Sequence, residues 1–355
     1  MQSTQDSQGA PGAPATRPRP PADATGARPD DAAIARARET LGRLRGEVER
    51  VIVGKREVID RLLIAMLAEG HVLIEDVPGI GKTKLARSLS LALGGDFHRI
   101  QFTPDLLPSD VTGSLVFDQR TASFTYHPGP VFANVVLADE INRAGPRTQA
   151  ALLEAMEERQ VSVERETYPL PRPFLVIATQ NPVELEGTFP LPEAQLDRFL
   201  LSTAVGYPER DDERDILRRF RGDDPLTRLE AVTTPQEVAG LIGLVRGIYI
   251  GEAVEDYLLD LVRGTREHEE VELGASPRAA LALARAAQGS AVLAGRGFVI
   301  PDDVRAMAMP VLAHRIIPSA RVELRGRTKA AILAELVASV PVPVEADVEP
   351  VERGA

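Results

Sequence analysis

Residues 75–83 of the chain read Glu-Asp-Val-Pro-Gly-Ile-Gly-Lys-Thr, and they decide how the rest of the sequence is interpreted. An apolar run, residues 72–74, precedes them, and a stretch that can begin a helix, residues 84–87, follows. A strand, a glycine-bearing loop and a helix start, in that order, point backbone N–H groups and the positive end of a helix at one place, where a phosphate chain can sit. The order therefore predicts a P-loop.

Two side chains of this loop have the chemistry that nucleotide binding needs. Lys82 is expected to reach the outer phosphates of ATP, and the Thr83 hydroxyl to hold a Mg²⁺ ion that bridges them. The general pattern G-x-x-x-x-G-K-[ST] has Gly where this chain has Asp76, so an ordinary strand-to-helix turn is the alternative, and the flanking strand and helix favour the P-loop. The residues expected to contact the nucleotide are Pro78, Gly79, Ile80, Gly81, Lys82 and Thr83, together with Val53 and Gly54.

Composition narrows the class of protein. The chain has 355 residues, 44% of them hydrophobic, a net charge of −11 and no Cys, so it can form a large core but no disulfide or thiolate metal site. The acidic balance disfavours a protein that coats nucleic acid by charge alone. No apolar run reaches the roughly 18 residues of a membrane span, and no signal peptide opens the chain, so a cytoplasmic protein without membrane contact is expected.

The chain changes character along its length. Residues 1–33 are rich in Pro and Ala and poor in large apolar residues, and we expect a disordered tail there. Helical spacing runs from Ile34 to the break at Gly54, and a second helical stretch ends at Gly70. Strands and helices then alternate as far as residue 205, with a hairpin over residues 114–126 that is expected to project from the body. This alternation predicts an α/β domain over residues 34–205, built on a parallel sheet with helices on both faces.

Only helices are predicted from Asp211 onward. Several of them begin with Pro just after a capping residue, as at Thr234 and Ser276. We therefore expect an all-helical domain over residues 206–340. Residues 341–355 alternate Pro, Val and acids and are expected to form a flexible acidic tail.

A second group of polar residues follows the apolar strands. Asp139 and Glu140 end the apolar run 135–138, and Asn181 comes after the run 174–178. Asp139 can hold Mg²⁺, Glu140 can orient or deprotonate the attacking water, and the Asn181 amide can reach the γ-phosphate or that water. Taken singly, each is also a common strand-end or turn residue, and their combination with a P-loop favours the functional interpretation.

Two arginines are ambiguous on the residues alone. Arg198 ends a short helical stretch, where a cation is favourable for purely structural reasons. Arg278 lies in the first turn of a helix, where a cation is mildly disfavoured, so either a nearby anion or simple solvation explains it. The five His residues occur singly, and no metal site other than one for Mg²⁺ is predicted.

With these residues in view, the chain resembles the MoxR family of AAA+ ATPases. The resemblance covers about residues 34–340, and the stretches that carry it are residues 73–83, 138–144, 152–160, 178–182 and 191–199. It implies an AAA+ P-loop core followed by a helical lid domain, with Asp76 a residue that MoxR proteins commonly carry. By this resemblance Lys82 and Thr83 are Walker A, Asp139 and Glu140 Walker B, and Asn181 sensor 1; Arg198 matches the arginine finger, and Arg278 matches sensor 2.

The resemblance also implies an assembly and a kind of activity. MoxR-like ATPases are expected to form a homo-oligomeric ring, usually a hexamer, with ATP and Mg²⁺ at each subunit boundary and the 114–126 hairpin on the central or substrate side. They are associated with chaperone-like maturation of partner proteins, often ones with a von Willebrand factor A domain. Two other functions stay open: a nucleotide-gated scaffold with negligible turnover, and a DNA-acting AAA+ motor, which the acidic composition disfavours.

Overall fold

A five-stranded parallel sheet forms the centre of the computed structural model, which describes residues 29–120, 122–164, 166–181 and 187–343. The strands lie in the order β2-β5-β8-β1-β9. Their bounds are β1 Val72–Glu75, β2 Phe97–Gln101, β5 Val135–Asp139, β8 Leu175–Gln180 and β9 Leu201–Thr203. Every neighbouring pair is parallel, which confirms the predicted sheet.

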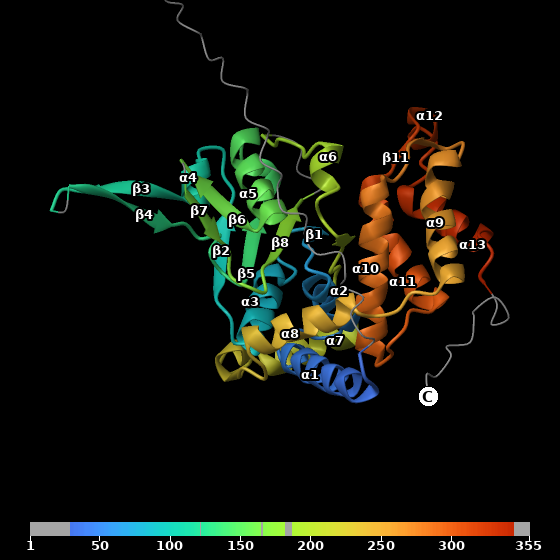
Figure 1. Ribbon diagram of the computed structural model, residues 1–355, viewed down its shortest axis with the longest axis horizontal. Helices are drawn as coiled ribbons and strands as arrows, with labels where there is room; N and C mark the ends of the chain where they lie inside the picture. The colour runs from blue at the N-terminus through green and yellow to red at the C-terminus, as the bar shows by residue number, and fades with distance from the viewer. Residues whose placement is uncertain (1–28, 121, 165, 182–186, 344–355) are drawn as a thin grey trace, which may run out of the picture.

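Both faces of the sheet are buried, as its continuous apolar strands predict. Side chains alternate along each strand, so Val72 and Ile74 enter one core while Leu73 enters the other. Helices α1 (Asp31–Glu49), α2 (Arg56–Leu67) and α3 (Lys82–Leu93) supply the first core, and α5 (Pro146–Glu158) supplies the second (Figure 1). The sheet thus lies between two helical layers, and the carboxyl ends of its strands form the edge where the candidate site lies.

The first helix begins earlier than the sequence indicates. It starts at Asp31, inside the stretch expected to be a disordered tail, because the Asp30 side chain accepts a hydrogen bond from the Ala33 N–H at 2.5 Å. It ends at Glu49, before Gly54. The rest of the expected N-terminal tail, residues 1–28, and residues 344–355 of the expected C-terminal tail lie outside the described residues.

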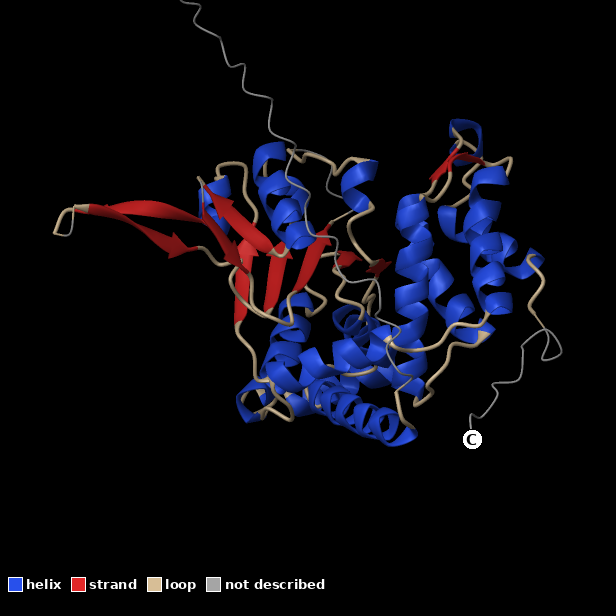
Figure 2. Ribbon diagram, viewed as in Figure 1, coloured by secondary structure: helices blue, strands red, loops and turns tan. Residues whose placement is uncertain are grey.

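Two hairpins interrupt the α/β alternation, and the first of them confirms the one expected over residues 114–126. The first joins β3 (Gly113–Asp118) to β4 (Ser123–Pro128) and extends well away from the body (Figures 1 and 2). Its outer part exposes Phe117 and Phe124, whose ring centroids lie 5.2 Å apart. The second joins β6 (Gln160–Val163) to β7 (Glu166–Pro169) directly after α5.

The carboxyl-terminal half is mainly helical. Its longer helices are α7 Arg210–Arg219, α8 Pro235–Arg246, α9 Glu252–Glu267, α10 Pro277–Ala294, α11 Pro301–Leu312 and α13 Lys329–Ser339. The short helices of the whole chain are α4 Pro108–Thr112, α6 Glu193–Leu196 and α12 Ala320–Glu323, among the described residues. The described 3₁₀ turns are Ile141–Arg143, Pro225–Arg228 and Ala313–Arg315. Helix α10 packs on α2, and one apolar cluster continues from the sheet into α9, α10 and α11. The helical part therefore shares a core with the sheet.

The expectation of helices alone after Asp211 is wrong in one detail. Strands β10 (Val271–Leu273) and β11 (Ile317–Pro318) pair antiparallel between the helices. Strands of two and three residues are too short to show an alternating pattern in a sequence. None of the described helices is both long and apolar enough to cross a bilayer.

Candidate nucleotide site

The P-loop follows β1 at the carboxyl edge of the sheet. Gly79 and Gly81 have φ of +85° and +90°, a conformation that favours glycine, and no other group lies within 4 Å of the positions their Cβ atoms would take. Helix α3 starts at Lys82, so its free N–H groups face the loop. The Lys82 Nζ donates to the Asp76 carbonyl at 2.9 Å. The loop thus has an open, positively polarised surface with the chemistry that phosphate binding requires.

The two predicted carboxylates lie at this same edge. Asp139 ends β5, Asn181 follows β8, and β8 lies between β5 and β1. The Thr179 hydroxyl donates to Asp139 Oδ1 at 2.7 Å and accepts from the Glu140 N–H at 2.9 Å. Glu140 has a φ of +56°, a conformation that non-glycine residues rarely adopt. This backbone conformation fixes the direction in which the Glu140 side chain leaves the end of the strand. The structure thus brings Asp139, Glu140 and Asn181 to the edge that bears the P-loop.

Strand β2 holds both carboxylates, a role that the sequence does not reveal. Arg99 pairs with Asp139 Oδ2 at 2.7 Å, and Gln101 donates to Glu140 Oε2 at 2.8 Å. Arg143 also donates to Glu140 Oε2, at 3.1 Å. The two-residue spacing of Arg99 and Gln101 puts them on one face, but only the strand order shows that this face lies beside β5.

Oxygen ligands suitable for Mg²⁺ are present among these residues. A hard cation takes hydroxyl and carboxylate oxygens, which Thr83 and Asp139 offer. The Arg99 guanidinium already neutralises Asp139, so a cation there would replace one positive partner with another. The donor set therefore fits the predicted metal.

A cavity of about 590 Å³ opens beside the P-loop and has the apolar walls that a nucleoside needs. Pro78 to Gly81 form one wall and Val53 another, and these are residues expected to contact the nucleotide. The remaining walls were not predicted: residues 205–208 and α7, which contributes Ile216 and Phe220 at or beside its end. Gly54, which was also expected to contact the nucleotide, allows α7 to approach instead. A Cβ at this position would lie 1.9 Å from the Asp212 carboxylate.

The two predicted arginines lie at the opposite edge of the sheet. Glu157, near the end of α5, binds both: its Oε2 lies 3.0 Å from Arg198 Nε and its Oε1 lies 2.5 Å from Arg278 Nη2. Their neighbour Leu200 donates to the carbonyl of His71, which precedes β1, whereas the P-loop follows β1. The four residues of β1 span about 13 Å, so the structure does not bring Arg198 and Arg278 to the P-loop of their own chain.

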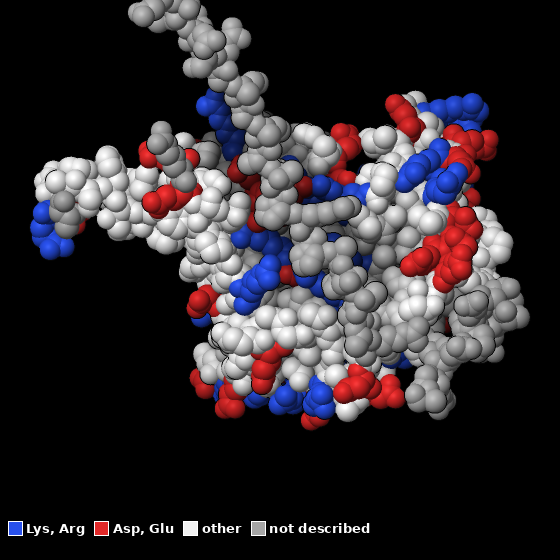
Figure 3. All heavy atoms as spheres, viewed as in Figure 1, with Lys and Arg blue, Asp and Glu red and all other residues white. Residues whose placement is uncertain are grey.

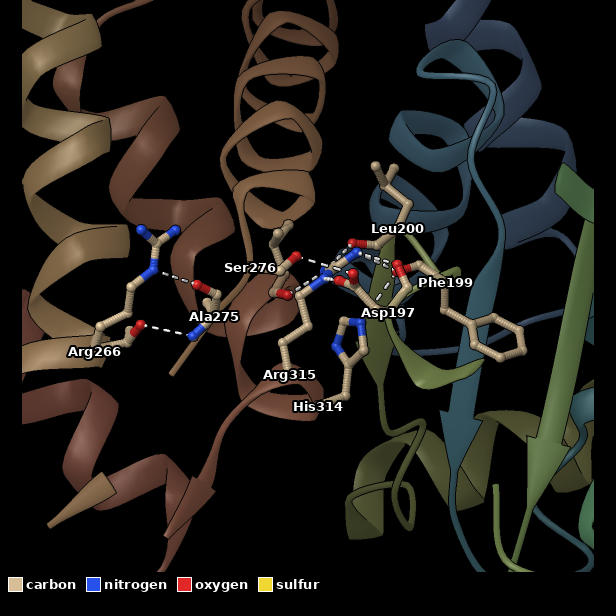
Figure 4. A network of polar contacts seen from close by, with 10 residues as sticks. Asp197, Phe199, Leu200, Arg266, Ala275, Ser276, His314 and Arg315 are labelled. Carbon is tan, nitrogen blue, oxygen red and sulfur yellow. Dashed lines mark hydrogen bonds and ion pairs between the residues drawn. The ribbon is translucent and has the colours of Figure 1, made fainter. Parts of the chain in front are cut away.

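A buried polar network fixes the segment that carries Arg198 (Figure 4). The Arg315 guanidinium, with 2% of its side chain exposed, pairs with Asp197 Oδ1 at 2.8 Å and donates to the carbonyls of Phe199 and Leu200 at 2.6 and 3.0 Å. Ser276, two residues before Arg278, donates to Asp197 Oδ2 at 2.9 Å. Burial lowers the pKa of Arg315, and Asp197 opposes that shift. One network thus locates both arginines.

The fold and this edge of the sheet define a class, the AAA+ ATPases. The model of the ATPase family associated with various cellular activities matches residues 71–201, and that of the AAA lid domain matches residues 263–336. A crystal structure of a candidate ATPase from Cytophaga hutchinsonii superposes with a TM-score of 0.82 at 38% identity, covering 88% of this chain and 97% of that one.

Curated relatives narrow the class to a family. Chaperone MoxR1 of Mycobacterium tuberculosis is 44% identical over 78% of this chain and 76% of its own length. Protein MoxR of Methylorubrum extorquens is 34% identical over 88% and 97%, and the uncharacterized Bacillus subtilis protein YeaC is 48% identical over 86% and 95%. The chain belongs to the MoxR family of AAA+ ATPases.

Proposed function

We propose that the protein is a Mg-ATP-hydrolysing ring ATPase that remodels or matures partner proteins. The observation that carries this is the division of one catalytic set between two edges of the sheet: Lys82, Asp139 and Glu140 on one, Arg198 and Arg278 on the other. A head-to-tail ring joins opposite faces of adjacent subunits, so the arginines of one chain would complete the site of the next. The family membership supports ATPase activity, and the name of the relative MoxR1 supports a chaperone-like role.

Each side chain then has a definite task. Bound ATP would draw Lys82 from the Asp76 carbonyl to the phosphates, while Thr83 and Asp139 hold the Mg²⁺ that neutralises them. Glu140 would orient or deprotonate the attacking water once Gln101 and Arg143 release its carboxylate. Asn181, next to it along the sheet edge, would fix the γ-phosphate or the water. The proposed partner is another protein chain, for which a von Willebrand factor A domain protein is the expectation.

The rate of phosphate release from ATP tests this proposal directly. We expect Glu140→Gln to keep nucleotide binding and to lose at least about a hundredfold in turnover, because it removes a general base. We expect Lys82→Ala to lose nucleotide binding as well. Glu154→Gln, an exposed acid on α5, is the matched control and should hydrolyse like the wild type. Equal hydrolysis by the wild type and Glu140→Gln would show that Glu140 has been given the wrong role.

The scaffold alternative has one observation in its favour. In the single chain both Walker B carboxylates are engaged, Asp139 by Arg99 and Glu140 by Gln101 and Arg143. A protein that kept these contacts after assembly would bind ATP without turning it over. Turnover at saturating ATP, measured on the assembled oligomer, separates this function from hydrolysis.

Surface charge gives no support to a DNA-acting motor on the side that Figure 3 shows. Acidic and basic side chains of the described residues are interspersed there, and the chain as a whole has a net charge of −11. Binding to the phosphate backbone of DNA by charge depends on many clustered Lys and Arg contacts.

A further inference from the structure

Asp76 occupies the P-loop position where the general pattern has glycine, yet the backbone there does not need glycine. The positive φ angles of the loop are at Gly79 and Gly81, and Asp76 is outside the set of described residues with positive φ. Its own N–H donates to the Gln180 carbonyl at 3.1 Å, continuing the sheet by one residue. A side chain can therefore stand at position 76 without backbone strain, and its contacts decide what it does.

The Asp76 carboxylate is buried and fully occupied by backbone donors. Its Oδ2 accepts from the N–H groups of Val205 and Gly206 at 2.7 and 2.6 Å, and its Oδ1 accepts from Val77 at 2.9 Å. The residue is 9% exposed. A buried charge is tolerated when hydrogen bonds satisfy it, and here donors distant in sequence supply two of the three.

These bonds join two walls of the same cavity. Residues 78–81 of the P-loop line one side of the 590 Å³ cavity, and residues 205–208 line another before the chain enters α7. Lys55, which also lines the cavity, holds the second wall by donating to the Tyr207 carbonyl at 2.8 Å. Asp76 is thus the direct link between the loop that would hold the phosphates and the wall that would hold the nucleoside.

We propose that Asp76 is a positioning residue that presets this cavity for nucleotide by tying residues 205–206 to the P-loop. The inference rests on the proposed function, since it concerns the same ATP site. A wall that is already in place loses less freedom when ligand binds, so the tie should strengthen binding of any adenine nucleotide. It should act equally on ADP and on ATP, because the wall lies on the nucleoside side of the loop. Turnover at saturating ATP should not change.

Two substitutions distinguish a positioning role of Asp76 from the alternative that Asp is accepted at this position without affecting nucleotide binding. Asp76→Gly removes all three bonds and recreates the general P-loop pattern. Asp76→Asn keeps the size of the side chain but replaces one acceptor oxygen with an NH₂ group, which cannot accept from a backbone N–H. Ser202→Ala is the matched control, because it removes another bond between β9 and β1, from Ser202 to Glu75 at 2.9 Å, at the same edge and leaves Asp76 intact.

Titration calorimetry of the full chain with Mg-ADP and with the non-hydrolysable analogue AMP-PNP gives the first readout. We expect the Kd of both ligands to rise by the same factor, roughly ten- to a hundredfold in Asp76→Gly, the range for lost hydrogen bonds to a charged group. Asp76→Asn should show a smaller rise, and Ser202→Ala none. The KM for ATP should rise in parallel while kcat stays constant.

Amide hydrogen exchange gives a second readout that holds even if Asp76→Gly folds poorly. Exchange at residues 204–208 should accelerate in Asp76→Asn and remain unchanged in β5. Wild-type affinity in Asp76→Gly, or weakening of AMP-PNP binding alone, would overturn the inference while leaving the proposed function intact. If the wild type itself binds neither nucleotide, the proposed function fails and the inference falls with it.

Discussion

His71, at the entrance to β1, shows how burial sets the chemistry of a single residue. The Val176 N–H donates to its Nδ1 at 3.0 Å, and its Nε2 lies 3.1 Å from the Met156 carbonyl. A carbonyl can only accept, so Nε2 carries the proton and the ring is neutral. Burial lowers the pKa of His71 from 6.5 to about 4, because a charged ring would lose its hydration and its bond from Val176.

This shift predicts that acid weakens the fold. Between about pH 6.5 and pH 4, His71 is protonated in the unfolded chain but neutral in the folded chain. The free energy of unfolding should therefore fall by up to about 3 kcal/mol as the pH is lowered across that window. His314, whose pKa burial also lowers, acts in the same direction. Denaturant unfolding at several pH values measures the slope. His71→Gln keeps a donor and an acceptor without titrating, and its slope should be shallower; identical slopes would contradict the assignment.

The positions of the candidate site residues were predictable where they depend on local order along the chain. Lys82 and Thr83 follow from the strand, loop and helix around them. Asp139 and Glu140 follow from the end of an apolar strand. Arg99 and Gln101 could not be found, because their role depends on which strand lies beside β5. The partners of Asp76 are likewise 129 and 130 residues further along the chain.

Between elements, a buried ion pair adds a polar contact to the apolar core that the helical part shares with the sheet. Arg315 follows α11, and Asp197 follows α6. The ion pair between them, and the bonds from Arg315 to the carbonyls before β9, link the helical part to the sheet. The His314 ring adds a contact of 3.1 Å to the Phe199 carbonyl. In Figure 4 this network lies between the lid helices and the sheet. The position of Arg198 therefore depends on the lid.

Removing Arg315 should weaken this link. Arg315→Ala removes a donor from the Asp197 carboxylate and from four backbone carbonyls, and we expect a loss of about 3 kcal/mol in the free energy of unfolding. Arg321→Ala, an exposed arginine on the nearby α12, is the control and should change stability by no more than about 0.5 kcal/mol. Thermal and denaturant unfolding compare the two variants. If both lose equally little, the network is not what holds the lid against the sheet.

The long elements were more predictable than the short ones for a physical reason. Helix α3 follows the loop as expected from the helix-starting stretch 84–87; it begins at Lys82 and ends at Leu93, because Gly81 and Gly94 bound it with left-handed φ. Arg198 was expected to end a short helical stretch, but α6 ends at Leu196. The N–H groups of Arg198 and Phe199 donate to carbonyls three residues back, which is a tighter turn than an α-helix, and Arg315 also donates to the Asp197 carbonyl. The strands β10 and β11 depend on a pairing 44 or more residues apart, which no local pattern encodes.

At the scale of the whole molecule, the proposed function requires a site that two neighbouring chains complete together. Arg198 and Arg278 share Glu157 at the amino end of β1, while Lys82, Asp139 and Glu140 lie at the carboxyl edge. Assembly would exchange Glu157 for the phosphates of a neighbouring subunit as the partner of both arginines. An arginine supplied in this way typically contributes about 10³ to 10⁵ in rate, so isolated chains should be nearly inactive.

Mixing two inactive variants tests this claim most directly. Arg198→Ala keeps its own Glu140, and Glu140→Gln keeps its own Arg198, so each should be inactive alone. When the two are co-expressed in equal amounts, roughly a quarter of the interfaces in a random ring join an intact Glu140 to an intact Arg198. The account predicts that phosphate release recovers in proportion to these interfaces. A mixed oligomer no more active than either variant alone, or an Arg198→Ala chain as active as the wild type, would contradict it.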